Sequence, residues 1–112
     1  MSLGVELIEL LGPDDREGQR FPCELRMSPT GARCQIGQSP DVELVLPRKN
    51  YPDLAQRHIG VLFPPNGGVR VETYQRHLSS TIDGKVIDGS SIEPGEHLLV
   101  LGAHRFKMII RV

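Results

Sequence analysis

The sequence has no tryptophan, and its aromatic residues are three phenylalanines and two tyrosines. It also lacks an excess of positive charge, since its formal net charge is −1. Proteins that read single-stranded nucleic acid stack bases on aromatic side chains beside a basic groove. Attraction to duplex nucleic acid or to an anionic membrane surface needs clustered cations. With neither feature present, the composition excludes nucleic acid as a partner.

Long apolar runs are missing as well. No stretch approaches the roughly 20 apolar residues of a membrane helix. The first eleven residues contain two glutamates and no basic segment ahead of an apolar core, which argues against a secretory signal. We therefore expect no membrane insertion and a cytoplasmic location.

Cysteine is scarce, with only Cys23 and Cys34 in the chain. One pair does not make the disulfide framework of a small secreted domain. If the flanking segments form a hairpin with Arg26 near Arg33, Cys34 faces Leu25 instead of Cys23. The sequence therefore predicts free, buried thiols.

No catalytic or metal-binding group can be assembled from the chain. A nucleophile needs a base and an orienting acid near it, and zinc needs four ligands of the His, Cys or carboxylate type. The histidines are scattered and no Cys-x-x-Cys is present; they are His58, His77, His97 and His104. We expect no cofactor, no metal and no enzymatic activity, and we expect His97 and His104 to face solvent beside the last hairpin.

Alternation with a period of two is what the sequence does have. Apolar and polar residues alternate over 21–27, 69–74 and 105–112, with Ile109 as an exposed apolar exception. Successive side chains of a strand point to opposite faces, so each run predicts a strand with one buried face. Clusters of Gly, Pro, Asn and Asp between the runs supply turn conformations. The pattern predicts an all-β sandwich or small barrel.

The length predicts one domain over residues 1–112, because 112 residues suffice for a single core of two packed layers. We exclude residues 1–4 from functional argument, since Met1-Ser2-Leu3 resembles an expression-vector remnant or a disordered end.

The order of motifs from residue 34 onward is specific. It runs through Ile36-Gly37-Gln38, an acidic stretch at 41–46, Ala55-Gln56-Arg57-His58-Ile59, two acid–glycine turns at 83–84 and 88–89, and Gly95 to Gly102 before a last strand. This order and spacing resemble the forkhead-associated (FHA) domain family over about residues 5 to 112. The resemblance implies an FHA/SMAD-like β-sandwich of about eleven mostly antiparallel strands. Its loops at one end would bind a protein partner, in that family typically a phosphothreonine peptide.

The resemblance also implies which positions would contact the phosphopeptide, and this chain departs from the family at almost all of them. Gln38 stands where the family has arginine, and Ala55 and Gln56 stand where it has Ser-Arg. Asp83 and Asp88 replace the two asparagines of the family's Asn-Gly motifs. Four residues fit the pattern, and we assign them structural roles: Gly37, His58, Gly84 and Gly89.

Other cations lie in the same predicted loops and would offer a rearranged phosphate site. Arginine in particular forms bidentate bonds with phosphate or carboxylate. The alternative is that these side chains are solvated loop charges, as most Lys and Arg are. The candidates are Arg48, Lys49, Arg57, Arg76 and His77.

Three functions follow from these observations. The first is a non-catalytic protein-interaction module that docks a partner with little or no dependence on phosphate. The second is a phosphothreonine reader that uses the rearranged cations. The third is a structural or self-associating domain of a larger assembly, for which the sequence sets no oligomeric state.

Overall fold

The computed structural model describes residues 3–76 and 78–112. Over these residues the chain forms eleven strands and no helix, and so contains no helix able to span a membrane. The strands are β1 (Leu3–Leu11), β2 (Arg16–Leu25), β3 (Ala32–Gly37), β4 (Leu44–Val45), β5 (Ile59–Phe63), β6 (Val69–Thr73), β7 (Ser80–Ile82), β8 (Lys85–Val86), β9 (Ser91–Ile92), β10 (Gly95–Leu101) and β11 (His104–Arg111).

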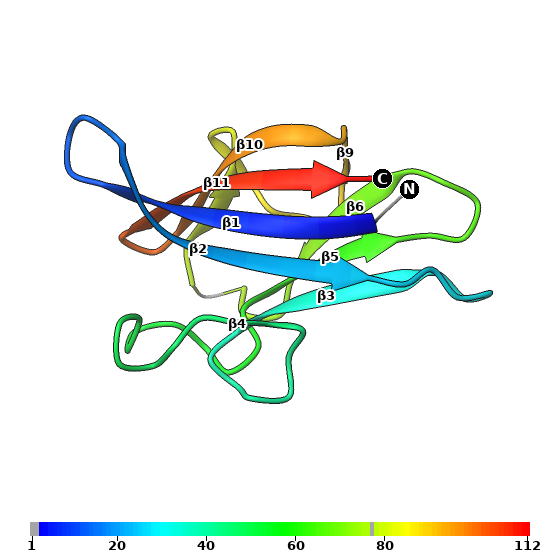
Figure 1. The fold of residues 1–112 in the computed structure, drawn as a ribbon, viewed down its shortest axis with the longest axis horizontal. Helices are drawn as coiled ribbons and strands as arrows, with labels where there is room; N and C mark the ends of the chain where they lie inside the picture. Colours follow the sequence, from blue (N-terminus) through cyan, green and yellow to red (C-terminus); the bar gives the residue numbers. More distant parts are fainter. Residues whose placement is uncertain (1–2, 77) are drawn as a thin grey trace.

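The strands form two stacked sheets (Figure 1). One sheet has six strands in the order β2-β1-β11-β10-β7-β8, and the other has five in the order β4-β3-β5-β6-β9. All pairs are antiparallel except β3 with β4. The predicted all-β sandwich of about eleven mostly antiparallel strands is confirmed.

The core lies between the sheets and is built from the alternating apolar positions. In β11, for example, Phe106, Met108 and Ile110 are all buried, whereas Ile109 between them is only half-buried on the outer face. The same period of two buries Val69 and Val71 in β6. Because strand side chains alternate between faces, these runs fix which face of each sheet points inward.

The hairpin considered for the segments around Cys23 and Cys34 does not form. Strand β2 pairs with β1 and β3 pairs with β5, so the two cysteines lie on different sheets. The two thiols are close enough in the core to shift each other's pKa, and both are free and buried. The expectation of free, buried thiols is therefore met, although Cys34 faces Cys23 and not Leu25.

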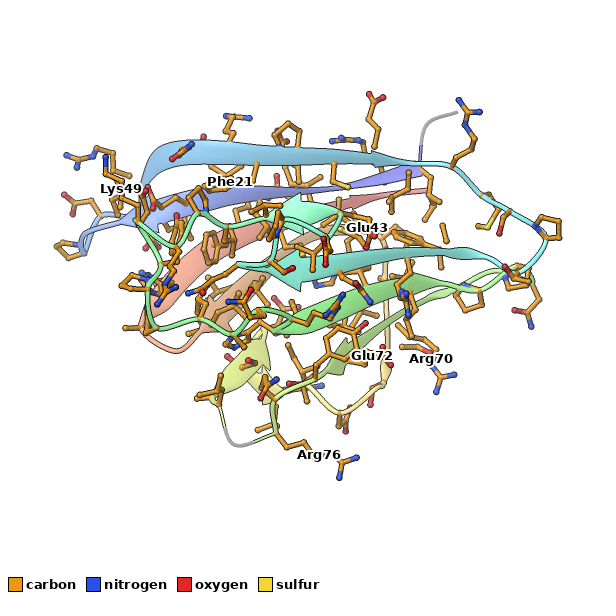
Figure 2. All side chains as sticks on the ribbon, turned by 90° about the horizontal axis from the view of Figure 1, so that it is seen from below. Phe21, Glu43, Lys49, Arg70, Glu72 and Arg76 are labelled. Carbon is orange, nitrogen blue, oxygen red and sulfur yellow. The ribbon has the colours of Figure 1, made fainter. Side chains whose placement is uncertain are left out.

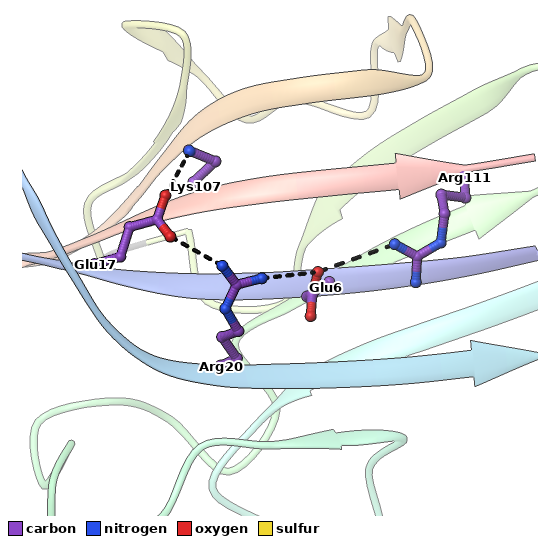
Figure 3. A network of polar contacts seen from close by, with 5 residues as sticks. All are labelled: Glu6, Glu17, Arg20, Lys107 and Arg111. Carbon is purple, nitrogen blue, oxygen red and sulfur yellow. Dashed lines mark hydrogen bonds and ion pairs between the residues drawn. The ribbon is translucent and has the colours of Figure 1, made fainter.

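The outer face of the six-stranded sheet carries a chain of ion pairs (Figure 3). Glu17 pairs with Lys107 at 2.8 Å and with Arg20 at 3.0 Å, and Glu6 lies 4.0 Å from both Arg20 and Arg111. The hydrogen bond and the charge of Lys107 hold the pKa of Glu17 below its ordinary value. These pairs join β1, β2 and β11 across the face, and their three cations exceed the two carboxylates by one charge.

Turns from both sheets meet at one end of the sandwich, which we call the loop end. It comprises residues 38–58, 74–76, 78–79 and 102–103, and it lies opposite the end where β1 begins and β11 finishes (Figure 1). The Gly102 N–H donates to the Ser79 carbonyl at 2.8 Å, which joins two of these turns. Residues 1–2 lie outside the described residues, whereas Leu3 and Gly4 belong to β1.

Candidate functional site

The loop end is organised around the point where β3 finishes at Gly37. The N–H groups of Gln38 and Ser39 donate to the carbonyls of Ala55 and Gln56, each at 3.1 Å, so the chain after β3 runs against the segment before β5. This approach leaves no room for a side chain at Gly37, where a Cβ would lie 2.2 Å from the Gln56 carbonyl oxygen. Glycine is therefore required at position 37 by a close backbone approach.

The side chain of Gln38 is used inside the domain. Its Nε2 donates to the Tyr51 carbonyl at 2.6 Å, which ties the end of β3 to the middle of the long loop before β5. Because the amide of Gln38 donates to the backbone of Tyr51, it has one donor fewer for a ligand.

Tyr51 anchors that loop, although it lies in none of the sequence motifs. Its ring is buried against Phe21, Phe106 and His104, and its hydroxyl donates to Glu9 of β1. Burial, together with Glu9, raises the pKa of the phenol, so it remains a donor at neutral pH. An aromatic residue in a polar, proline-flanked loop was the signal that could have identified it.

A second anchor lies beside Tyr51. The Oδ1 atom of Asp53 accepts a hydrogen bond from His104 Nε2 at 2.7 Å, which fastens the loop to the β10–β11 turn. This bond is the largest cause that lowers the pKa of Asp53. The predicted solvent-facing position of His104 is wrong, because its side chain is half-buried in this contact.

His58 is buried at the centre of the loop end. Its Nδ1 accepts a hydrogen bond from the Ala55 N–H at 3.1 Å, so this nitrogen carries no proton. The proton is then on Nε2, which lies 3.1 Å from the Ser80 hydroxyl oxygen. His58 therefore holds the loop before β5 and the start of β7 at once.

The predicted cations are dispersed around the loop end. Arg48 and Lys49 are exposed on a turn closed by the N–H groups of residues 50 and 51 donating to the Pro47 carbonyl. Arg57 donates from Nε to Gln35 at 3.3 Å and lies 4.0 Å from Asp41. Figure 2 shows Lys49 and Arg76 at well-separated positions, with Arg76 pointing away from the domain. His77 lies outside the described residues.

Asp83 lies in the two-residue turn between β7 and β8, with Gly84. Its carboxylate accepts hydrogen bonds from the Leu98 N–H at 2.9 Å and from His97 Nδ1 at 2.7 Å. The structure thus brings Gln38, Ala55, Gln56 and His58 together and places Asp83 against β10.

His97 completes this second cluster. Its Nε2 lies 2.6 Å from the Glu93 carbonyl oxygen, so both ring nitrogens face atoms that can only accept. Burial alone lowers the pKa of His97, but the bonds to Asp83 and Glu93 outweigh it and the net pKa is raised. Its predicted solvent exposure is wrong, since the side chain is only 11% exposed. Gly89 opens the next turn, where its N–H donates to the Val71 carbonyl at 3.0 Å.

Chemically, the loop end is a set of backbone turns fixed by internal hydrogen bonds, with exposed polar side chains such as Arg48, Lys49 and Asn50 on its surface. Among the described residues, no three His, Cys, Asp or Glu side chains are close enough together to hold a metal ion. Ala55 contributes only backbone groups, its N–H to His58 and its carbonyl to the Gln38 N–H. The loop end therefore presents a surface whose backbone is fixed by hydrogen bonds within the domain.

Comparison with solved structures decides the fold. The FHA domain of the CT664 protein from Chlamydia trachomatis superposes with a TM-score of 0.65 at 15% identity, covering 97% of this chain and 99% of that one. The chain has the FHA fold. The N-terminal FHA domain of Rad53p from S. cerevisiae, solved with a phosphothreonine peptide, gives a TM-score of 0.67 at 13% identity, covering 96% of this chain and 94% of that one.

The same fold extends to the cytoplasmic domain of PscD, a type III secretion sorting-platform protein of P. aeruginosa. That domain matches with a TM-score of 0.54 at 16% identity, over 95% of this chain and 79% of its own. No family model matches the sequence, and no curated protein is significantly similar to it. The FHA fold is thus shared with proteins of low sequence identity to this one.

Proposed function

We propose that this FHA-fold domain is a non-catalytic interaction module that docks a protein partner through its loop end without reading phosphothreonine. The observation that carries the proposal is the Gln38 side chain. It stands where the family pattern has a phosphate-binding arginine, and it donates to the Tyr51 carbonyl.

The energetics favour this function over phosphate reading. A hydrogen bond from a charged donor to phosphate contributes about 1.5–3 kcal/mol, and arginine supplies two in a bidentate pair. Gln38 is neutral, and Ala55 has no side-chain donor in place of the expected serine. Since about 1.4 kcal/mol is tenfold in affinity, losing these bonds weakens phosphopeptide binding by two orders of magnitude or more.

The loops form a surface that is already ordered before any partner binds. Gln38, Tyr51 and His58 hold residues 38–58 by hydrogen bonds that need no ligand. A surface ordered in advance loses little conformational entropy on binding, so modest contacts suffice for affinity. This rigidity supports recognition of an unmodified protein surface or peptide.

The test is selection from a displayed library of unphosphorylated peptides, followed by affinity measurements on loop-end variants. Arg48→Glu and Lys49→Glu alter exposed side chains of the loop end, whereas Arg70→Glu alters an exposed side chain of β6 and is the matched control. We expect the loop variants to weaken the selected peptides at least fivefold and the control to leave them unchanged. Equal binding by all three variants would overturn the proposed site.

A second candidate function is scaffolding within a larger assembly. The observation that favours it is the shared fold with the PscD domain, whose name places that protein in a sorting platform. Sedimentation over a hundredfold range of concentration distinguishes the two functions. A constant monomer mass supports the interaction module, and a mass that rises with concentration supports self-association.

A further inference from the structure

The most exposed large apolar side chain among the described residues is Val86, on the two-residue edge strand β8. It is 76% exposed, against 52% for Val112, 47% for Met27 and 38% for Val45. A β-branched residue in a strand normally packs against neighbours. Val86 instead stands as a ridge on the side of the sandwich where both sheets end, in β8 and β9.

A hollow lies on each side of this ridge. One has a volume of about 340 Å³ and the other about 580 Å³, and both are lined by Val86, Ile87 and Asp88. The floor of the first includes Val71, Ile82 and Ile87, which belong to the core. Because β8 and β9 are only two residues long, the core reaches the surface here.

The walls of the first hollow are held in place by hydrogen bonds. Asp83 ties the β7–β8 turn to Leu98 and His97, and the His97 ring continues to the Glu93 carbonyl. On the rim, Asp88 accepts from the N–H of Ser90 at 3.0 Å. The hollow is therefore preformed, as binding sites generally are.

The edge also offers backbone groups. Val86 lies opposite Thr81, and the next residue, Ile87, donates its N–H to the Ser80 carbonyl at 3.2 Å. Hydrogen-bonded pairs alternate along an antiparallel ladder, so the N–H and C=O of Val86 point away from β7 to the open edge. A partner backbone can pair with them there.

The charge of the surface is negative. Four carboxylates line the two hollows, together with three cationic groups: Lys85, the His97 ring and Arg76, whose side chain points away from the domain. The count leaves an excess of one negative charge even with His97 protonated; the carboxylates are Glu72, Asp83, Asp88 and Glu93. Hydrogen bonds from Ser90 hold the pKa of Asp88 below its ordinary value, so the carboxylate shared by both hollows is ionised at neutral pH. Glu93 has no ion-pair partner within 4.0 Å among the described residues.

We propose that Val86 and its two flanking hollows form a second protein-docking surface, and that its partner is an extended segment carrying lysine or arginine next to an apolar side chain. The apolar side chain fills a hollow beside Val86, and the cation meets Asp88 and Glu93. The long stem of lysine or arginine can also lie on the apolar floor while its charge stays at the rim. This surface includes none of Gln38, Ala55 and Arg48, although Arg76 and Leu78 of the loop end line the second hollow.

The probes are two pools of unphosphorylated peptides, and every peptide has a fixed leucine. The leucine is flanked by lysines in one pool and by glutamates in the other. Both are titrated into the isotopically labelled domain, with backbone amide shifts as the readout. We expect the lysine pool to shift amides of residues 85–88 and 90–93 and to bind at least tenfold more tightly than the glutamate pool. Raising salt from about 0.05 M to about 0.5 M should weaken it, because the Debye length shortens.

Three variants sharpen the test. Val86→Ser and Asp88→Asn change exposed groups, and each should weaken the lysine pool at least fivefold; Val112→Ser removes a comparably exposed valine elsewhere and should change nothing. Equal binding of both pools, shifts confined to other residues, or unchanged binding by Val86→Ser would overturn the proposal. Concentration-dependent shifts of the same amides without peptide, abolished by Val86→Ser, would make a second copy of the domain the occupant and would also overturn it.

Discussion

The His58 ring and the Ser80 hydroxyl are 3.1 Å apart and join the two sheets at the loop end, because His58 leads into β5 and Ser80 begins β7. Through Nδ1 the same ring holds the Ala55 N–H at 3.1 Å. One buried side chain therefore fixes its own loop, through Ala55, and joins that loop to Ser80, which is 22 residues away in the chain. The arrangement assigns His58 to the framework that positions the loops.

Replacing His58 with alanine should destabilise the domain by about 1–3 kcal/mol, because buried hydrogen-bond partners lose their bonds. Ser80→Ala removes only one end of the arrangement and should cost about 1 kcal/mol. Urea denaturation followed by circular dichroism measures both. An unchanged denaturation midpoint in His58→Ala would contradict the framework role.

The pair of His97 and Asp83 predicts a pH-dependent contribution to stability. The pKa of His97 is raised, so its contribution is fully present below the unfolded value near 6.5 and is lost as pH rises through the folded pKa. The pKa of Asp83 is lowered, so its contribution is present above about 3.8 and is lost as pH falls through the folded pKa. His97→Gln should therefore cost about 0.5–1 kcal/mol more near pH 5.5 than near pH 8.5.

Asp83→Asn is the control for this pH effect, since the amide oxygen still accepts from the Leu98 N–H but carries no charge. In that background the extra cost of His97→Gln near pH 5.5 should disappear. Thermal or urea unfolding at both pH values gives the comparison. Equal costs of His97→Gln at the two pH values in the wild-type background would show that the ion pair does not contribute.

Substitution by alanine should have different effects at Gly37 and Gly60. A Cβ at Gly37 meets the Gln56 carbonyl oxygen at 2.2 Å, which is backbone, whereas a Cβ at Gly60 meets the Tyr74 hydroxyl at 2.4 Å, the end of a side chain that can turn away. Gly37→Ala should therefore cost about 2–4 kcal/mol, and Gly60→Ala about 1 kcal/mol. Denaturation midpoints rank the two, and the reverse order would mean that the loop after β3 yields more easily than Tyr74.

The fold was predictable because it depends on a repeated local pattern. Alternation over 69–74 and 105–112 placed Val69, Val71, Phe106, Met108 and Ile110 in the core, where the structure has them, but it also placed Val112 there, which is exposed after the end of β11. Pairing partners were harder, because alternation defines which face of a strand is buried and not which strand lies beside it. The hairpin considered for the segments around the two cysteines is an example, since a turn at residues 28–31 also fits a crossover from one sheet to the other.

The site was predictable only in part. Ile36-Gly37 and His58 were found because they match motifs of the FHA family, which the order of segments in the sequence resembles. The position of Asp83 was not, since an Asp-Gly pair suits any tight turn and only the strand pairing places it beside β10. Tyr51 and Ser80 escaped because their contacts, with Glu9 and His58, come from segments far away in the chain.

Restoring the family's donors should restore phosphate binding. The double variant Gln38→Arg, Ala55→Ser replaces an internally bonded amide with a guanidinium and returns a hydroxyl donor, and bidentate arginine bonds to phosphate are strong. We expect a gain of at least tenfold in affinity for phosphothreonine peptides. No gain would show that Gln38 also has a structural role, because loss of its hydrogen bond to the Tyr51 carbonyl would then have displaced the loop.

The most direct test of the central claim is a parallel titration of the purified domain with a degenerate phosphothreonine peptide pool and its unphosphorylated counterpart, by calorimetry or fluorescence polarisation. The double variant and free inorganic phosphate serve as positive and specificity controls. The account predicts no more than a twofold preference of the wild-type domain for the phosphorylated pool, with a clear preference in the double variant. Wild-type binding of the phosphorylated pool at micromolar strength, with the unphosphorylated pool at least tenfold weaker, would contradict it and assign phosphate reading to the rearranged cations Arg48, Lys49, Arg57 and Arg76.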